Sequence, residues 1–153
     1  MAALWLESPL LASMQALSVG LLELFWTVEF LLRLLTGVRL IGLTDYMFKT
    51  DNPLFVRGLS LFHLVLPFLL LWLVYRLGYE ARAWMAQTLL AWAILLLCFF
   101  FTDPAENINW AFGLGNEPQK RINPALYLVL LMAGFPLLVY LPTHLLLETF
   151  LGK

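Results

Sequence analysis

Residues 83–102 read AWMAQTLLAWAILLLCFFFT, a run of 20 residues that contains no charged side chain. A helix needs about 20 apolar residues to cross the hydrocarbon core of a bilayer. Because lipid offers the backbone no hydrogen-bond partner, a segment that crosses it in this way has to be helical. This run therefore predicts a transmembrane helix and an all-α membrane fold.

Two other segments have the same character. Residues 53–75 carry one charged side chain, Arg57, and residues 124–147 carry none. Both runs begin at an Asn-Pro pair, which is typical of a helix N-cap followed by the first helical position. Together with residues 83–102, they predict three strong membrane spans.

The N-terminal segment, residues 10–35, is long enough to span but contains Glu23, Glu29 and Arg33. On a helical wheel most of its polar residues share one sector, opposite an apolar side. One interpretation is an amphipathic first span whose polar stripe faces its neighbours. The other is a helix that lies in the membrane interface. We favour the first, which gives an integral membrane four-helix bundle, because three helices leave one face poorly covered.

The composition supports a single transmembrane domain over residues 1–153. Hydrophobic residues make up 62% of the chain and charged residues 12%, with a mean hydropathy of +0.86. A soluble domain of this size could not bury so much apolar surface. A net charge of -1 without a Lys/Arg cluster gives no field for nucleic acid. The expected partner is the lipid bilayer, in a bacterial inner membrane, with room for another membrane protein or a second copy of the chain.

A polar stretch separates the last two strong spans. Its candidate functional residues are Asp103, Glu106, Asn107, Asn109 and Trp110, with Asn116 further along. Asp103 followed three residues later by Glu106 resembles a capping box. This pattern predicts a short interfacial helix over residues 104–112. The stretch is either a structured re-entry loop or a rim that docks a partner or ligand.

Two polar residues are expected at similar depth in the membrane. Glu23 lies 13 residues before Thr36, and His63 lies 10 residues after Pro53. At 1.5 Å per residue, these separations are about 20 Å and about 15 Å along antiparallel helices. We therefore predict that Glu23 and His63 share a hydrogen bond or line one pocket. That pair is either a structural link or a ligand and proton contact.

Other candidate residues have simpler interpretations. Glu29 and Arg33 are four residues apart with the acid first, which predicts a local ion pair. Cys98 is the only cysteine, so no zinc or disulfide site is expected. His63 and His144 are predicted at different depths, which argues against haem. We expect no cofactor and no metal.

The absence of a catalytic constellation in the sequence favours a non-catalytic subunit, scaffold or accessory protein over an enzyme. The alternative is a membrane-embedded enzyme or binding protein for a lipid or quinone. Its intramembrane pocket would use Glu23, Glu29, Arg33 and His63.

Residues 74–82 read VYRLGYEAR and lie between two predicted spans. This stretch resembles the GYxxR turn of the DoxX-like and HTTM-type membrane bundles, and hydropathy order extends the resemblance over about residues 10–112. The resemblance implies a four-helix bundle with Arg76 and Arg82 in the cytoplasm. It implies no activity, because this chain lacks the lysine and paired cysteines that those relatives use. The chain is also similar to small bacterial multi-pass membrane-associated proteins. Counting Lys and Arg instead predicts that the two longer loops are cytoplasmic.

Overall fold

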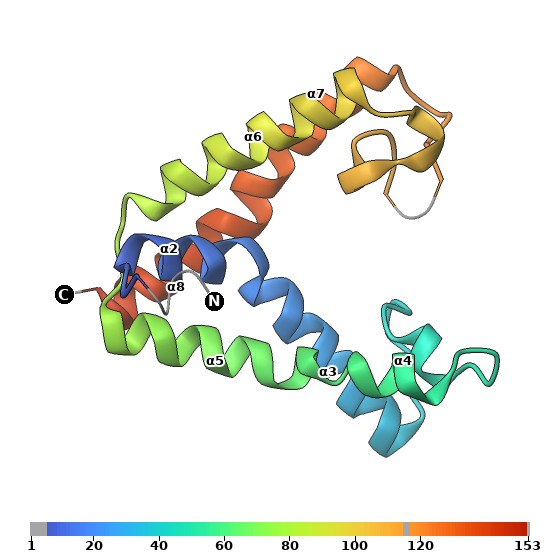
Figure 1. The fold of residues 1–153 in the computed structure, drawn as a ribbon, viewed down its shortest axis with the longest axis horizontal. Helices are drawn as coiled ribbons and strands as arrows, with labels where there is room; N and C mark the ends of the chain where they lie inside the picture. The colour runs from blue at the N-terminus through green and yellow to red at the C-terminus, as the bar shows by residue number, and fades with distance from the viewer. Residues whose placement is uncertain (1–5, 115–116, 153) are drawn as a thin grey trace.

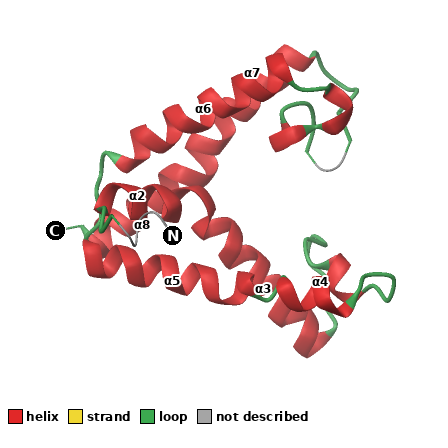
Figure 2. Ribbon diagram, viewed as in Figure 1, coloured by secondary structure: helices red, strands yellow, loops and turns green. Residues whose placement is uncertain are grey.

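The structure is a computed structural model that describes residues 6–114 and 117–152. These residues form helices joined by loops, with no strand among them (Figure 2). The α-helices are α2 (Pro9–Gln15), α3 (Leu21–Thr36), α4 (Leu54–Leu59), α5 (Phe62–Leu77), α6 (Ala83–Phe101), α7 (Pro124–Gly134) and α8 (Leu141–Leu151). Two π-helical turns, Ala16–Gly20 and Phe135–Tyr140, join α2 to α3 and α7 to α8. The predicted all-α class is confirmed.

The helices meet at one end of the molecule and diverge toward the other (Figure 1). One arm is formed by α3 and α5, and the second by α6 and α7. At the joint between the arms, α2 packs against both α5 and α6. The turn at residues 78–82 and the end of α8 also lie at the joint, whereas the loops of residues 37–53 and 102–123 lie at the tips of the arms.

The joint holds the main hydrophobic core. Ala12, Ala16 and Leu17 pack there against Val74 and Ala83, and all five are at most 2% exposed. Small side chains at such positions let helix backbones approach closely, which is how helices associate in an apolar environment. Because α2 packs against both α5 and α6 in this core, it joins the two arms at the end where they meet.

Three helices are long and apolar enough to cross a membrane: Leu54–Leu77, Ala83–Phe101 and Pro124–Leu151. They correspond to the three strong spans, although the last continues beyond residue 147. A π-helical turn that contains Pro136 interrupts this last helix, since proline cannot donate the hydrogen bond that a regular helix requires. The first segment is helical from Pro9 to Thr36 but is not among these three helices.

The predicted interfacial helix over residues 104–112 is wrong. The chain forms two short 3-10 turns there, Pro104–Glu106 and Ile108–Trp110. Asn107, Asn109 and Trp110 have φ values of 45°, 54° and 59°, which a right-handed helix does not allow. The Asp103 side chain does accept a hydrogen bond from Ala105 N at 2.8 Å, so the predicted cap is real but serves only the first 3-10 turn.

Candidate functional site

The predicted contact between Glu23 and His63 is confirmed. A carboxylate oxygen of Glu23 on α3 meets Nδ1 of His63 on α5, and their side chains are only 13% and 23% exposed. The rings of Trp26 and Phe62 lie against the imidazole, with centroids at 4.6 and 4.0 Å. Thr27 Oγ1 also donates to the backbone oxygen of His63 at 2.9 Å. Two polar contacts therefore link α3 and α5 at one level.

This contact uses one side-chain polar atom of each residue. Nδ1 of His63 is the donor or the acceptor in this contact, depending on the tautomer of the imidazole and on which residue carries the proton. Neither residue lines the two large cavities described below. The contact is thus a polar link between neighbouring helices.

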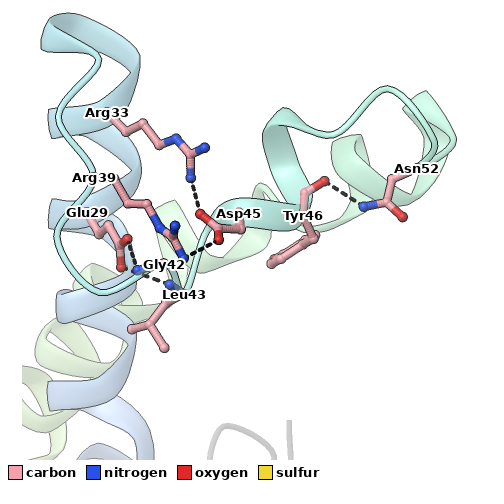
Figure 3. Close-up of polar contacts among 8 residues, drawn as sticks. All are labelled: Glu29, Arg33, Arg39, Gly42, Leu43, Asp45, Tyr46 and Asn52. Atoms are coloured by element: carbon pink, nitrogen blue, oxygen red, sulfur yellow. Dashed lines mark hydrogen bonds and ion pairs between the residues drawn. The ribbon is translucent and has the colours of Figure 1, made fainter. Parts of the chain in front are cut away.

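Glu29 anchors the loop that follows α3. Its carboxylate is buried, at 1% exposure, and accepts hydrogen bonds from Gly42 N at 2.6 Å and Leu43 N at 3.1 Å (Figure 3). Gly42 has a φ of 92°, and a Cβ there would meet the guanidinium of Arg39 at 2.6 Å. Hydrogen bonds to a charged acceptor are stronger than neutral ones, so Glu29 fixes this turn against α3.

The predicted ion pair between Glu29 and Arg33 is wrong, because each residue binds a different part of the loop. Arg33 pairs with Asp45, and Arg39 reaches the other carboxylate oxygen of Asp45 at 2.7 Å (Figure 3). The Arg33 guanidinium also lies 4.5 Å from the ring centre of Phe48. Because both oxygens of Glu29 accept hydrogen bonds from backbone N–H groups, the Arg33 guanidinium pairs with Asp45 in the loop instead.

The loop after α6 is held by an amide instead of charges. Asn107 is 5% exposed, donates to Gly113 O at 2.7 Å and accepts from Phe112 N at 2.9 Å. Its φ of 45° is a left-handed conformation that asparagine tolerates better than most residues. Asn107 therefore closes the loop on itself. Asn116, also a candidate from the sequence, lies outside the described residues.

Folding back of this loop creates a partly polar cavity of about 570 Å³ beside α6. Figure 1 shows the loop on the inner side of the α6–α7 arm. The polar side chains that line the cavity include Gln87, Glu106, Asn109, Trp110 and Tyr140. Three of these were candidates from the sequence, and the structure brings them together. Asp103 does not line the cavity.

Gln87 and Tyr140 were missed by the sequence analysis. Both line the cavity, Gln87 from α6 and Tyr140 from the π-helical turn after α7. Gln87 is the only amide side chain within residues 83–102, and a lone amide in an otherwise apolar run is a signal that could have been followed. Tyr140 gave no such signal, because tyrosines near the ends of membrane helices are common anchors.

A second cavity, of about 590 Å³, is almost wholly apolar. It lies between the π-helical turn after α2, α5 and α8, and Leu24, Phe68 and Leu146 are among the residues that line it. An apolar groove on the outside of such helices is a surface that lipid chains can fill.

A third polar cluster lies at the joint and was also missed. The Tyr79 hydroxyl is 2.6 Å from Nδ1 of His144, whose Nε2 is 3.1 Å from Glu148. Burial, and secondarily the charge of Glu148, raises the pKa of Tyr79 to about 12. The cluster connects the turn of residues 78–82 to α8. His144, expected only as an interfacial residue, is thus a cross-link between segments 65 residues apart.

The two histidines have different partners, Glu23 for His63 and Tyr79 with Glu148 for His144. Over residues 6–114 and 117–152, no three His, Cys, Asp or Glu side chains gather as metal ligands would. In comparisons with known proteins, the chain matches no family model, no curated protein and no solved structure. The resemblance to DoxX-like and HTTM-type bundles rests on residues 74–82 and hydropathy order, so the geometry of the chain has to carry the functional argument.

Proposed function

We propose that the chain is a multi-pass integral membrane protein of the bacterial inner membrane that acts as a non-catalytic subunit, scaffold or accessory protein. One observation carries the proposal: the charged side chains that the first helical segment brings to membrane depth are used within the chain. Glu23 binds His63, Glu29 binds backbone N–H groups and Arg33 binds Asp45. Groups that are paired in this way hold helices and loops in place.

Membrane insertion is supported by where the apolar side chains lie. Three helices have the length and hydropathy of spans, and their outward residues are exposed, such as Phe68 at 61%, Leu97 at 57% and Leu130 at 56%. Exposed apolar area on this scale would be unfavourable in water. We also propose Pro9–Thr36 as the fourth span, since Glu23 and Arg33 on it have partners.

The topology has a direct test. Single cysteines are placed at Lys49, Arg82 and Gln119 in a Cys98→Ser background and labelled in intact cells and in inverted vesicles with a membrane-impermeant maleimide. We expect positions 49 and 119 to react from one side and position 82 from the other, as their places at the tips and the joint indicate. Labelling of position 82 from the same side as position 49 would overturn the four-span proposal.

The scaffold role has a separate test. Native membranes that contain the tagged chain are solubilised mildly and resolved by native electrophoresis. We expect a species well above the 17.5 kDa monomer, unchanged by Glu23→Gln because an amide keeps the hydrogen bond to His63. Two differently tagged copies distinguish self-association from a second protein. Migration as a monomer alone would contradict this role.

The alternative is a membrane protein that binds a lipid or quinone. The structure supports a pocket for it beside α6, and not around Glu23 and His63 as the sequence predicted. Its support is the cavity beside α6, which combines an apolar wall with Glu106, Asn109 and Tyr140. The expected pocket around Glu23 and His63 has no such support, since those two side chains bind one another.

A further inference from the structure

The cavity beside α6 has an apolar wall and a polar rim. Its wall includes Ala91, Ile94 and Leu95 on the inner face of α6, together with Phe135 from the π-helical turn. Its rim is the loop segment that contains Glu106, Asn109 and Trp110. This rim belongs to the loop that follows α6 and folds back beside it, so that it faces the apolar wall. The division matches a molecule with a polar head and a hydrocarbon tail.

The charge at the rim is negative and has no cation beside it. Glu106 is the one charged side chain among the residues that line the cavity. Among the described residues, the ion pairs formed by Arg, Lys and His involve other carboxylates. Glu106 is exposed, so its carboxylate is open to a positive group that enters the cavity. The rim therefore favours the ammonium end of a zwitterionic headgroup over an anionic headgroup.

The two neighbours of Glu106 at the rim suit an ammonium group. The Asn109 amide nitrogen donates to Cys98 Sγ at 3.2 Å, which leaves its carbonyl oxygen as an acceptor. Trp110 supplies an indole ring, the side chain that attracts cations most strongly through its π face. Both residues have positive φ values, which are costly for side chains other than glycine and gather at binding sites.

We propose that this cavity binds a phospholipid with a primary ammonium headgroup, of the ethanolamine type. The ammonium contacts Glu106, the carbonyl oxygen of Asn109 and the face of Trp110, and one acyl chain lies along the apolar wall of α6. An anionic headgroup finds no cation there. A choline headgroup has no N–H to donate. A quinone carries no positive charge to pair with Glu106.

This inference rests on the membrane insertion proposed above but not on the scaffold role. The test uses the full-length protein in detergent, titrated with phosphatidylethanolamine, phosphatidylcholine or phosphatidylglycerol that carry identical acyl chains. Native mass spectrometry measures the bound fraction. We expect phosphatidylethanolamine to bind about tenfold more tightly than the other two, the size of effect that a charge-assisted hydrogen bond gives.

The variants assign that preference to the rim. Glu106→Gln should bring the three lipids to within about twofold of one another, whereas Asp51→Asn, the same charge change on the other loop, should leave the preference intact. Ile94→Trp fills the apolar wall and should weaken binding of phosphatidylethanolamine without altering Glu106. Soluble phosphoethanolamine should not compete, because it lacks the chain.

Several results would overturn the proposal. They are equal binding of the three lipids to the unchanged protein, a preference for phosphatidylglycerol or a quinone, a preference that survives Glu106→Gln, or full competition by soluble phosphoethanolamine. Size-exclusion profiles of each variant show that the fold is retained. The cysteine labelling described above reports on membrane insertion separately, so failure of lipid selectivity and failure of insertion are distinguishable.

Discussion

The two arms end in loops that are held by different chemistry. At the tip of the α3–α5 arm, residues 37–53 are held by charges: Glu29 binds two backbone N–H groups, and Asp45 receives both Arg33 and Arg39. At the tip of the α6–α7 arm, residues 107–113 are held by the Asn107 amide, and Glu106 remains at the rim of a cavity.

The comparison of the two loops distinguishes polar groups that hold the chain in place from polar groups that remain available to a ligand. In the first loop these charges are paired or hydrogen-bonded within the chain, so little is left to recognise a ligand. In the second a neutral amide supplies the hydrogen bonds, and a carboxylate is left facing an apolar wall. A charged residue in a largely apolar helix is thus a weak sign of function until its partner is known.

The largest expected effect is at Glu29. Glu29→Ala leaves the N–H groups of Gly42 and Leu43 without their acceptor, which should cost about 3 kcal/mol. Hydrogen exchange should accelerate at residues 42 and 43, with a lower unfolding midpoint in detergent. Asp51→Ala, in the same loop but exposed, is the control. Unchanged exchange in Glu29→Ala would show that charge does not hold this loop.

Asn107 should come next. Asn107→Ala removes its bonds to Gly113 and Phe112 and places alanine at a φ of 45°, for a loss of about 2 kcal/mol. Asn107→Gly removes the same bonds without the strain, so it should be less destabilising by roughly 1 kcal/mol. Thermal unfolding of both variants measures the two contributions. Equal losses would mean that backbone strain plays no part in the loop.

Glu23 gives a smaller change that separates pairing from charge. Glu23→Gln keeps a hydrogen bond to His63, so a loss under about 1 kcal/mol is expected. Glu23→Leu leaves the imidazole without its partner and should cost more, with faster exchange of the α5 amides around residue 63. If the glutamine variant were as unstable as the leucine variant, the charge itself would hold the α3–α5 arm together.

These contrasts also show what the sequence could predict. The three long apolar helices were predictable, because nearly uncharged runs such as residues 83–102 have the length and composition of a membrane helix. The Glu23–His63 contact was predictable from depth alone, since two polar groups at one level of neighbouring helices have few other partners. The second loop was not predictable, because three residues with positive φ depend on bonds that Asn107 makes within the folded loop. Spacing in the sequence also could not predict that Gln87 and Tyr140 line the same cavity, because they lie 53 residues apart in the chain.

At the joint between the arms, Tyr79 provides a pH-dependent test. Its pKa is raised from 10.0 to about 12, so the folded chain keeps the phenol proton over a range in which the unfolded chain loses it. The contribution of Tyr79 to stability is therefore present below pH 10 and falls as the pH rises toward 12. Tyr79→Phe should lose less stability than the unchanged protein over this range. Identical alkaline profiles would show that the phenol proton does not link the turn to His144.

The smallest expected effect is at Asp103, at the base of the second loop. Capping side chains are worth about 1 kcal/mol at the start of a helix, but Asp103 caps a 3-10 turn of three residues and is exposed. Asp103→Ala should therefore lower stability by about 0.5 kcal/mol at most and leave protease access at residues 107–110 unchanged, because Asn107 closes the loop independently. Asn107→Ala in the same digestion is the positive control and should increase cleavage. Cleavage in Asp103→Ala that matched this control would mean that the loop depends on its charged cap, as the first loop depends on Glu29, and the contrast between the two arms would not hold.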